Sequence, residues 1–447
     1  MRAFTQRVFR LQAGEGKLVF ILGLLILANA LSQQITEITA LSNFLNTAGV
    51  NQILIVWIVD CIVILLITAL QSLIIDRFTR VSLMRLLLFI LGVVFLALRL
   101  LFVFHLPKWL NFAIVYVVAE QQWLFVPLVF WVLANDIFEM VQAKRLFPVI
   151  ASASFAGRLL GIGLAAIIPG ILERIPTLKP EDLLIFNTII YMLMFLMFNQ
   201  GIQSIKVRQT SQDRQTVRET LTEGWGFVRE VLSFRYLMLA MLAVSVIITI
   251  IDFHFLVVSN KTFHNPDNFQ TFYSLYRLGL VLASMMIQGL FTSRLIGGMG
   301  LKNVFLILPV VLLASSVGVA VLPGIIMCTA GIVLARLAQS TTDESARKAF
   351  QALVPEERRG RVSMFMDSYL FAAGTIAGCV ITGLVVLVGT ALGSPNYAFA
   401  YLAIAACAAL FAIWAILRMR SVYDMSLFNW RLKRRQHRTS VLDKLTF

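Results

Sequence analysis

Residues 82–104 of the chain read SLMRLLLFILGVVFLALRLLFVF, a run in which Arg85 and Arg99 are the only charged side chains. A helix that crosses a bilayer needs about 20 mostly apolar residues, so this stretch is long enough to cross one. Other runs of the same kind occur along the whole chain. The twelve predicted spans are residues 17–36, 51–75, 82–104, 108–135, 147–172, 183–205, 234–258, 270–293, 303–322, 324–341, 362–390 and 397–417. The sequence therefore predicts an all-α polytopic membrane protein.

The composition agrees with this prediction. Of 447 residues, 59% are hydrophobic and 14% are charged, whereas soluble domains average about 45–50% apolar and about 25% charged residues. The four cysteines lie inside apolar runs, without a CxxC pair or a nearby histidine cluster. We therefore expect neither a disulfide framework nor a metal site. No nucleophile–base set and no phosphate-binding glycine loop is recognisable, so we expect no enzyme activity and no cofactor.

The distribution of Lys and Arg predicts the orientation. With the N-terminus inside, 31 of the 38 Lys and Arg residues fall in segments on the cytoplasmic side and four fall in external loops. Positive charge collects on the cytoplasmic side of membrane proteins, so both termini are expected in the cytoplasm. The net charge of +15 then reflects topology and contact with anionic lipid rather than nucleic-acid binding. Basic loops and the lack of a transit-like leader favour a bacterial inner (plasma) membrane, and we expect a monomer.

An internal repeat predicts two similar halves. Residues 155–161 (FAGRLLG) resemble residues 372–378 (AAGTIAG), which lie 217 positions later in the corresponding span of the second half. Both copies carry two glycines four residues apart, a spacing that lets helices approach closely. The predicted domains are a six-helix bundle over 1–205, a cytoplasmic linker with an amphipathic helix over 206–233, a second six-helix bundle over 234–417 and a basic cytoplasmic tail over 418–447. A parallel repeat of six helices is the architecture of major facilitator transporters.

Two loops, one in each half of the sequence, also resemble a known loop motif. Residues 76–80 (DRFTR) after the second span and residues 293–302 (SRLIGGMGLK) after the eighth are similar to the loop motif of the major facilitator superfamily. The first copy lacks the leading glycine of that motif and the second lacks its acidic residue.

Further stretches carry a closer resemblance. They are residues 131–138 (WVLANDIF), 143–148 (AKRLFP), 251–255 (IDFHF) and 353–361 (LVPEERRGR), together with Asp367. These stretches resemble the ATP/ADP translocase family of plastids and intracellular bacteria, and especially its relatives in free-living bacteria. The resemblance implies a membrane transporter and points to nucleotides as substrates. The charged substrate-binding residues of the translocases are not carried over to positions of this chain.

Ionisable side chains within the spans are the candidate functional residues, because each costs about 2.5–3.5 kcal/mol to insert into a bilayer. The seven that stand out are Asp60, Arg99, Glu120, Arg158, Asp252, His254 and Arg277. Their depths allow three acid–base pairs on neighbouring helices, namely Asp60 with Arg99, Glu120 with Arg158, and Asp252 with Arg277. Each pair could be a structural salt bridge, but Glu120 and Arg158 lie deepest. Gln121, Gln122 and Trp123 extend the polar patch beside Glu120.

These charges predict an anionic substrate. Arginine offers planar, bidentate donors for phosphate or carboxylate groups, and Arg158 and Arg277, one from each half, could hold an anion from two sides. The expected substrate-binding residues are Arg158, Glu120, Arg277, Arg99, Gln121 and Trp123. The expected coupling or gating residues are Asp60, Asp252, His254, Asp76, Arg77 and Asp367. The predicted function is secondary transport of an organic anion, such as a nucleotide, by alternating access of the two halves.

Three alternatives remain open. Glu120, Asp252 or His254 could titrate as the substrate binds, which would make transport proton-coupled. The same fold could instead carry a lipid, peptide or drug-like substrate, with its charges paired off around an apolar cavity. A membrane scaffold or sensor that has lost transport would keep the fold without a continuous central cavity.

Overall fold

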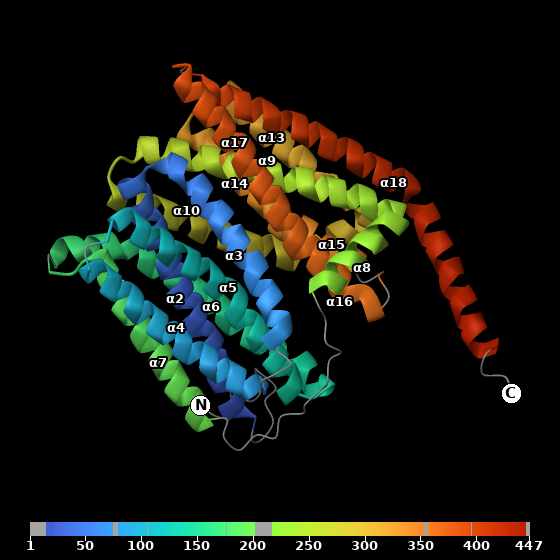
Figure 1. The fold of residues 1–447 in the computed structure, drawn as a ribbon, viewed down its shortest axis with the longest axis horizontal. Coiled ribbons are helices and arrows are strands. Elements are labelled where there is room, and N and C mark those ends of the chain that lie inside the picture. Colours follow the sequence, from blue (N-terminus) through green and yellow to red (C-terminus); the bar gives the residue numbers. More distant parts are fainter. Residues whose placement is uncertain are drawn as a thin grey trace. The chain divides into compact units, whose positions relative to one another are not determined.

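The structure is a computed structural model that describes residues 15–74, 79–104, 106–175, 177–201, 217–351, 354, 356–394 and 396–443. Its α-helices are α2 (Gly16–Ala48), α3 (Ile53–Ile74), α4 (Arg80–Val103), α5 (Lys108–Ile137), α6 (Met140–Arg174), α7 (Leu183–Gly201), α8 (Val217–Glu230), α9 (Leu232–Thr262), α10 (Pro266–Ile287), α11 (Ser293–Met299), α12 (Leu301–Val304), α13 (Ile307–Val321), α14 (Ile325–Leu337), α15 (Glu344–Gln351), α16 (Glu356–Met364), α17 (Leu370–Ala391) and α18 (Tyr397–Asp443) (Figure 1). The described part of the chain contains no β-strand.

The twelve predicted spans are confirmed. Twelve helical segments among the described residues are long and apolar enough to cross a membrane, and each overlaps one predicted run. The largest difference lies in the first span, because α2 continues to Ala48 through a polar stretch that hydropathy alone placed outside the membrane. Gly49 ends this helix with a φ of 86°, a conformation that glycine adopts without strain.

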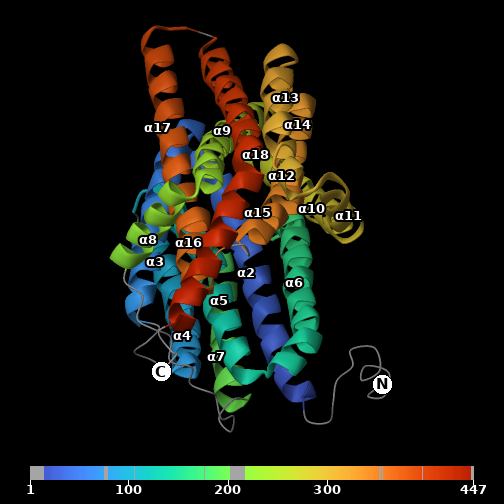
Figure 2. The ribbon, with the colours of Figure 1, turned by 90° about the vertical axis from the view of Figure 1, so that its right-hand side faces the viewer.

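The contacts divide the chain into two compact units. The first unit comprises Met1–Gln52, Ile67–Arg214 and Asn260–Val281, and the second comprises Ile53–Leu66, Gln215–Ser259 and Leu282–Phe447. The first part of α10 therefore packs with helices from the first half of the sequence. In the first unit α2 contacts both α5 and α6, and α4 lies beside α7 (Figure 1). In the second unit α13 lies beside α14 and α18 (Figure 2).

Glycines of the repeat allow close contact between helices in both units. A Cβ on Gly157 would lie 2.2 Å from the carbonyl oxygen of Leu27 on α2. A Cβ on Gly374 would lie 3.1 Å from the carbonyl oxygen of Leu242 on α9, and 2.5 Å from the Cβ of Ser245. Glycine at these positions thus lets α6 approach α2, and α17 approach α9, almost to backbone contact.

Burial separates central from lipid-facing helices. In the most apolar stretch of α2, 72% of the residues are buried inside the protein, and 61% are buried in α9, the first span of the second half. In contrast, α7 exposes Ile185, Ile189, Leu193 and Leu196, which follow one another at helical spacing. An apolar stripe on the outside of a bundle of spanning helices suits contact with acyl chains.

The predicted amphipathic helix of the linker is present as α8. Its Phe227 and Val228 are buried in an apolar cluster with Phe234 and Phe350 of the second unit, whereas Trp225 is exposed. The helix is therefore anchored to the second unit by its apolar face.

Candidate functional site

An ion pair between Arg277 and Glu37 is the centre of the polar site in the first unit. Nη2 of Arg277, on α10, donates to Oε2 of Glu37, on α2, at 2.9 Å. The Glu37 side chain is 6% exposed and that of Arg277 is 25% exposed. The carboxylate is thus almost fully enclosed, while the guanidinium keeps an accessible surface.

Two glutamines complete the surroundings of this ion pair. Gln33 donates to Oε2 of Glu37 at 2.9 Å, and Gln34 donates to the same oxygen at 3.4 Å. The Gln34 side-chain oxygen also accepts from Nη2 of Arg277 at 3.2 Å. Gln33, Gln34 and Glu37 lie on consecutive turns of α2, so this helix presents a polar face toward α10. Buried charges are tolerated when they are paired and hydrogen-bonded in this way.

Arg158 on α6 stacks over an aromatic ring. Its guanidinium carbon lies 3.8 Å from the centroid of the Trp123 ring on α5, within the range of a cation–π interaction. Glu120 lies three residues before Trp123 and thus on the same face of α5. Glu120 is also close enough to Arg277 to interact with it electrostatically. One face of α5 therefore links the two arginines.

Several aromatic side chains border the same region. The guanidinium carbon of Arg277 lies 5.9 Å from the ring centroid of Tyr273, and Tyr276 also interacts with Arg277. A Cβ added to Gly161 would lie 3.0 Å from the Cβ of Gln34. The turn of α6 that carries Arg158 and Gly161 therefore lies next to Gln34. We call the set Gln33, Gln34, Glu37, Glu120, Trp123, Arg158, Tyr273 and Arg277 the arginine cluster.

A neutral hydrogen-bond network lies beside the arginine cluster. Oγ of Ser32 donates to Asn187 at 2.9 Å, and Gln122 donates to Ser32 at 3.2 Å. Tyr191 is hydrogen-bonded to Gln122 and donates to Asn29 at 2.7 Å. These buried groups join α2, α5 and α7 by hydrogen bonds, which hold in place the helix that carries Glu37.

Arg99 and Asp252 differ from the predicted pairings. Nε and Nη2 of Arg99 donate to Oδ1 of Asp182 at 3.0 and 2.7 Å, so Arg99 pairs with Asp182 rather than with Asp60. Asp252, on α9, forms a salt bridge with Arg336 on α14, and Arg277 pairs with Glu37 instead of Asp252. The error has a simple cause, because depth along a helix does not say which face a side chain occupies.

The other predicted residues occupy separate places. His254 is buried on α9, and its Nδ1 lies 2.7 Å from the hydroxyl of Tyr401. Asp60 is buried on α3, and Gln121 is buried on α5 beside the arginine cluster. Asp76 and Arg77 lie outside the described residues. The roles assigned to these residues stay predictions.

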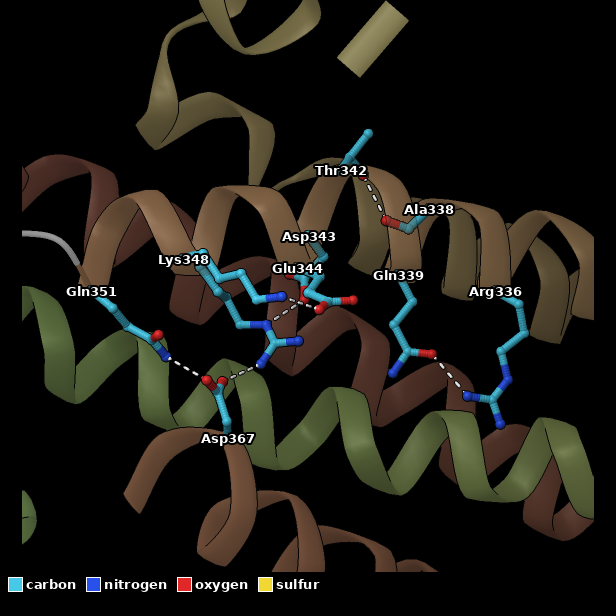
Figure 3. Close-up of polar contacts among 10 residues, drawn as sticks. Arg336, Ala338, Gln339, Thr342, Asp343, Glu344, Lys348, Gln351 and Asp367 are labelled. Carbon is cyan, nitrogen blue, oxygen red and sulfur yellow. Dashed lines mark hydrogen bonds and ion pairs between the residues drawn. The ribbon is translucent and has the colours of Figure 1, made fainter. Parts of the chain in front are cut away.

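Asp367 belongs to a second charged group, in the second unit. Nη1 of Arg347 donates to Oδ1 of Asp367 at 2.7 Å, and Nε of Arg347 donates to Oδ2 of Asp343 at 2.8 Å. Gln351 donates to the other oxygen of Asp367 at 3.0 Å (Figure 3). We call Asp343, Arg347 and Asp367 the acidic triad.

The described residues contain no group of three or more His, Cys, Asp or Glu that could hold a metal ion. Cys61, Cys328, Cys379 and Cys407 are all free thiols.

Sequence reasoning missed Glu37, Arg347 and Asp343. The signal for Glu37 was the run SQQITE at residues 32–37, which continues the helical spacing of the first span. Ending the predicted span at residue 36 excluded it. The predicted tenth span ended at residue 341, so Asp343 and Arg347 were placed in a cytoplasmic segment, although the helical span continues to Gln351.

The family model described as TLC ATP/ADP transporter matches residues 95–334, more than half of the chain. No curated protein sequence matches. A mutant of the nucleoside transporter NupG is similar with a TM-score of 0.66 and 14% identity, and the match covers 89% of this chain and 99% of that chain. A bacterial homologue of the iron transporter ferroportin in the inward-facing state gives a TM-score of 0.61 and 14% identity over 92% of this chain and 99% of that chain.

A transporter of the POT family in complex with 5-aminolevulinic acid gives a TM-score of 0.60 and 11% identity, over 89% of this chain and 96% of that chain. Such low identities show the fold alone, which is that of the major facilitator transporters. The twelve spans describe an integral membrane protein, and the family model that matches is that of a small-molecule transporter. Because the family model matches more than half of its residues, this chain belongs to the TLC ATP/ADP transporter family.

Proposed function

We propose that this protein is a secondary transporter of an organic anion such as a nucleotide, and that the arginine cluster binds the anion. The observation that carries this proposal is the convergence of Arg158 and Arg277 on one face of α5, through Trp123 and Glu120. Two guanidinium groups offer several donors to phosphate or carboxylate oxygens. The family to which the chain belongs is described as transporting ATP and ADP.

Glu37 and Glu120 would act as replaceable counter-ions. Two arginines without acidic partners would be costly inside a membrane span. An arriving anion competes with Glu37 for Nη2 of Arg277, so binding exchanges one ionic contact for another instead of creating a buried charge. The aromatic rings of Trp123 and Tyr273 beside the two guanidinium groups also suit a substrate that carries a planar ring.

Alternating access would involve the first part of α10. This segment comes from the second half of the sequence, yet it is bonded to helices of the first half. Gln270 donates to the carbonyl of Ala165 at 3.0 Å, and Ser42 donates to the carbonyl of Pro266 at 2.8 Å. The Arg277–Glu37 ion pair continues this contact. If the positive-inside rule sets the orientation, these bonds lie on the outer side and must break for the transporter to open outward.

The proposed setting is a bacterial inner membrane, with both termini in the cytoplasm and a monomer as the working unit. The proposed transport mode is exchange of internal for external anion. No nucleic acid and no cofactor take part in this proposal.

The test is uptake of labelled ATP and ADP by proteoliposomes preloaded with unlabelled nucleotide. Saturable exchange that is lost in Arg158→Gln supports the proposal. Arg145→Gln is the matched control, because the partner of Arg145 is Glu15, at the start of α2 and about 30 Å along that helix from Glu37. This control should keep exchange. No exchange by correctly folded wild-type protein would remove these nucleotides as exchange substrates.

A further inference from the structure

Aromatic side chains join α9 and α18 at the surface of the second unit. The ring centroids of Tyr236, on α9, and Trp414, on α18, lie 6.1 Å apart. Phe411 stacks on Trp414 with a centroid distance of 5.5 Å. Phe411 and Trp414 are each 44% exposed. The contact between the two helices is therefore aromatic and open to the surroundings of the protein.

Arginine side chains border this aromatic contact on one side. Arg418 lies four residues after Trp414, on the same face of α18 and about 6 Å further along the helix. Arg235 directly precedes Tyr236, and its Nη2 donates to the carbonyl oxygen of Arg229 at 2.8 Å. Arg229, Arg235 and Arg418 are all exposed. The aromatic contact thus has guanidinium groups next to it on both helices.

Helix α8 adds a tryptophan to the same surface. It meets α9 at Val231 and turns back to lie beside α16 (Figure 1). Phe227 and Val228 are buried in the apolar cluster of the second unit. Trp225 is 54% exposed and lies four residues before Arg229, so both belong to the outward face of α8.

The guanidinium groups of this surface have donors to spare. Neither Arg229 nor Arg418 forms a salt bridge with a carboxylate among the residues that the structure describes. Arg235 uses one nitrogen for the carbonyl of Arg229, and a guanidinium group carries five N–H donors. Glu230 is exposed, but it points about 100° away from Arg229 around α8. We call the set Trp225, Arg229, Arg235, Tyr236, Trp414 and Arg418 the interfacial patch.

The interfacial patch lies where two apolar spans end. Arg235 lies near the start of the span Leu232–Thr262, and Arg418 lies near the end of the span Tyr397–Tyr423. Tryptophan and tyrosine are enriched at the interfaces of a bilayer, and basic residues close to span ends attract anionic headgroups. In the orientation proposed above, this end of the spans is the cytoplasmic one.

We propose that the interfacial patch binds an anionic phospholipid of the cytoplasmic leaflet. The three guanidinium groups donate hydrogen bonds to the phosphate oxygens, and the acyl chains lie along Phe411 and Trp414. The indole ring of Trp225 lies at the level of the headgroups. A free phosphate or a nucleotide could use the same donors, but it would leave the exposed rings uncovered, which favours a lipid. Lipid binding here does not depend on the proposed transport function.

The first test measures lipid retention by native mass spectrometry of the full-length protein with added phosphatidylglycerol or phosphatidylcholine. Wild-type protein should retain phosphatidylglycerol in preference to phosphatidylcholine. Arg229→Gln and Arg418→Gln should each lower the affinity for phosphatidylglycerol by about fivefold, the contribution of one basic residue near an anionic surface. Lys261→Gln is the matched control, because Lys261 is an exposed cation at the opposite end of α9, and it should keep the wild-type affinity. Equal retention of the two lipids by wild-type protein, or an equal loss in the control, would overturn the proposal.

The second test locates the lipid and distinguishes it from a soluble anion. Wild-type protein in vesicles of phosphatidylcholine and photoreactive phosphatidylglycerol should be labelled in residues 225–236 and 411–418. An excess of inorganic phosphate should leave this labelling unchanged, because phosphate cannot replace the contacts of the acyl chains. Labelling that inorganic phosphate abolishes would assign the patch to a soluble anion and refute the lipid. Labelling confined to other segments would contradict the site.

Discussion

The two units share their packing but not their polar chemistry. Gly157 lets α6 approach α2, and Gly374 lets α17 approach α9, at corresponding places of the repeat. In the first unit, however, an arginine is held by one glutamate, two glutamines and nearby aromatic rings. In the second unit an arginine lies between two aspartates on π-helical turns. The repeat therefore accounts for the bundle architecture, while the polar contacts inside the two units differ.

The ionic partners of the buried arginines differ between the two units. The arginine cluster holds Arg158 and Arg277 with two glutamates as counter-ions, so an anion that displaces a glutamate would be held by guanidinium groups. In the acidic triad one guanidinium instead contacts two carboxylates. The predictions below compare matched changes in the two units.

The largest expected effect follows from removing one arginine from either the arginine cluster or the acidic triad. Arg277→Gln or Arg347→Gln leaves partly buried carboxylates without their guanidinium and should lower the free energy of unfolding by about 3–5 kcal/mol. Thermal unfolding of the purified protein in detergent measures the loss. A second change distinguishes the units. Adding Glu37→Gln to Arg277→Gln should recover most of the lost stability, because no unpaired carboxylate of this pair remains. Adding Asp343→Asn to Arg347→Gln should recover less, because the carboxylate of Asp367 still lacks its guanidinium. Equal recovery in both units would contradict the difference in ionic partners.

Removing the Glu37 carboxylate should change nucleotide affinity, whereas the matched change in the second unit should not. Glu37→Gln removes the competitor for Arg277, and a hydrogen bond to a charged group is worth about 1.5–3 kcal/mol. ADP affinity should therefore rise by about ten- to a hundredfold. Isothermal titration calorimetry checks this, with Asp343→Asn as the control that leaves the affinity unchanged. Weaker binding by Glu37→Gln would show that Glu37 orients Arg277 instead of competing with the substrate.

Alanine at the two repeated glycines should destabilise the units unequally. A Cβ on Gly157 meets a backbone oxygen at 2.2 Å, whereas a Cβ on Gly374 meets a backbone oxygen at 3.1 Å and a serine side chain at 2.5 Å. Overpacking costs about 1–3 kcal/mol, and Gly157→Ala should lie at the upper end. Thermal unfolding of both variants tests the order. A larger loss in Gly374→Ala would mean that α6 adjusts more easily than α17.

The smallest expected effect concerns the ring of Trp123 beside Arg158. Trp123→Leu removes a cation–π interaction worth about 0.5–2 kcal/mol from Arg158, so ADP affinity should fall by about two- to thirtyfold. Phe371→Leu, on α17 in the second unit, is the control and should not change the affinity. Trp123→Phe should retain part of the affinity. An unchanged affinity in Trp123→Leu would exclude the ring from the anion site.

Much of the fold was accessible from the sequence because spanning helices are long apolar runs with few charges. The twelve spans and the glycine repeat depend on composition and spacing, which the bilayer constrains strongly. Helix ends were less predictable, as α2 shows. Polar residues continue this helix to Ala48, and among them Glu37 and Ser42 are buried and bonded to α10. Hydropathy cannot distinguish such a buried polar face from a loop.

The candidate site was predictable only in part. Arg158, Arg277 and Trp123 stood out because charged and aromatic groups are conspicuous in apolar spans. The partners of Arg99, Asp252 and Arg277 depend on the rotation of each helix and on which helices are neighbours, and depth alone does not contain that information. The π-helical turns at Asp343 and Asp367 likewise have no signature in residue spacing.

The most direct measurement is amide hydrogen exchange of the wild-type protein in lipid, with and without ADP. The account predicts slower exchange with ADP in the segments that carry the arginine cluster, namely residues 33–37, 120–123, 158–161 and 273–277, and no change around residues 339–347. Slower exchange around residues 339–347 without any effect on the arginine cluster would contradict the assignment of anion binding to the first unit.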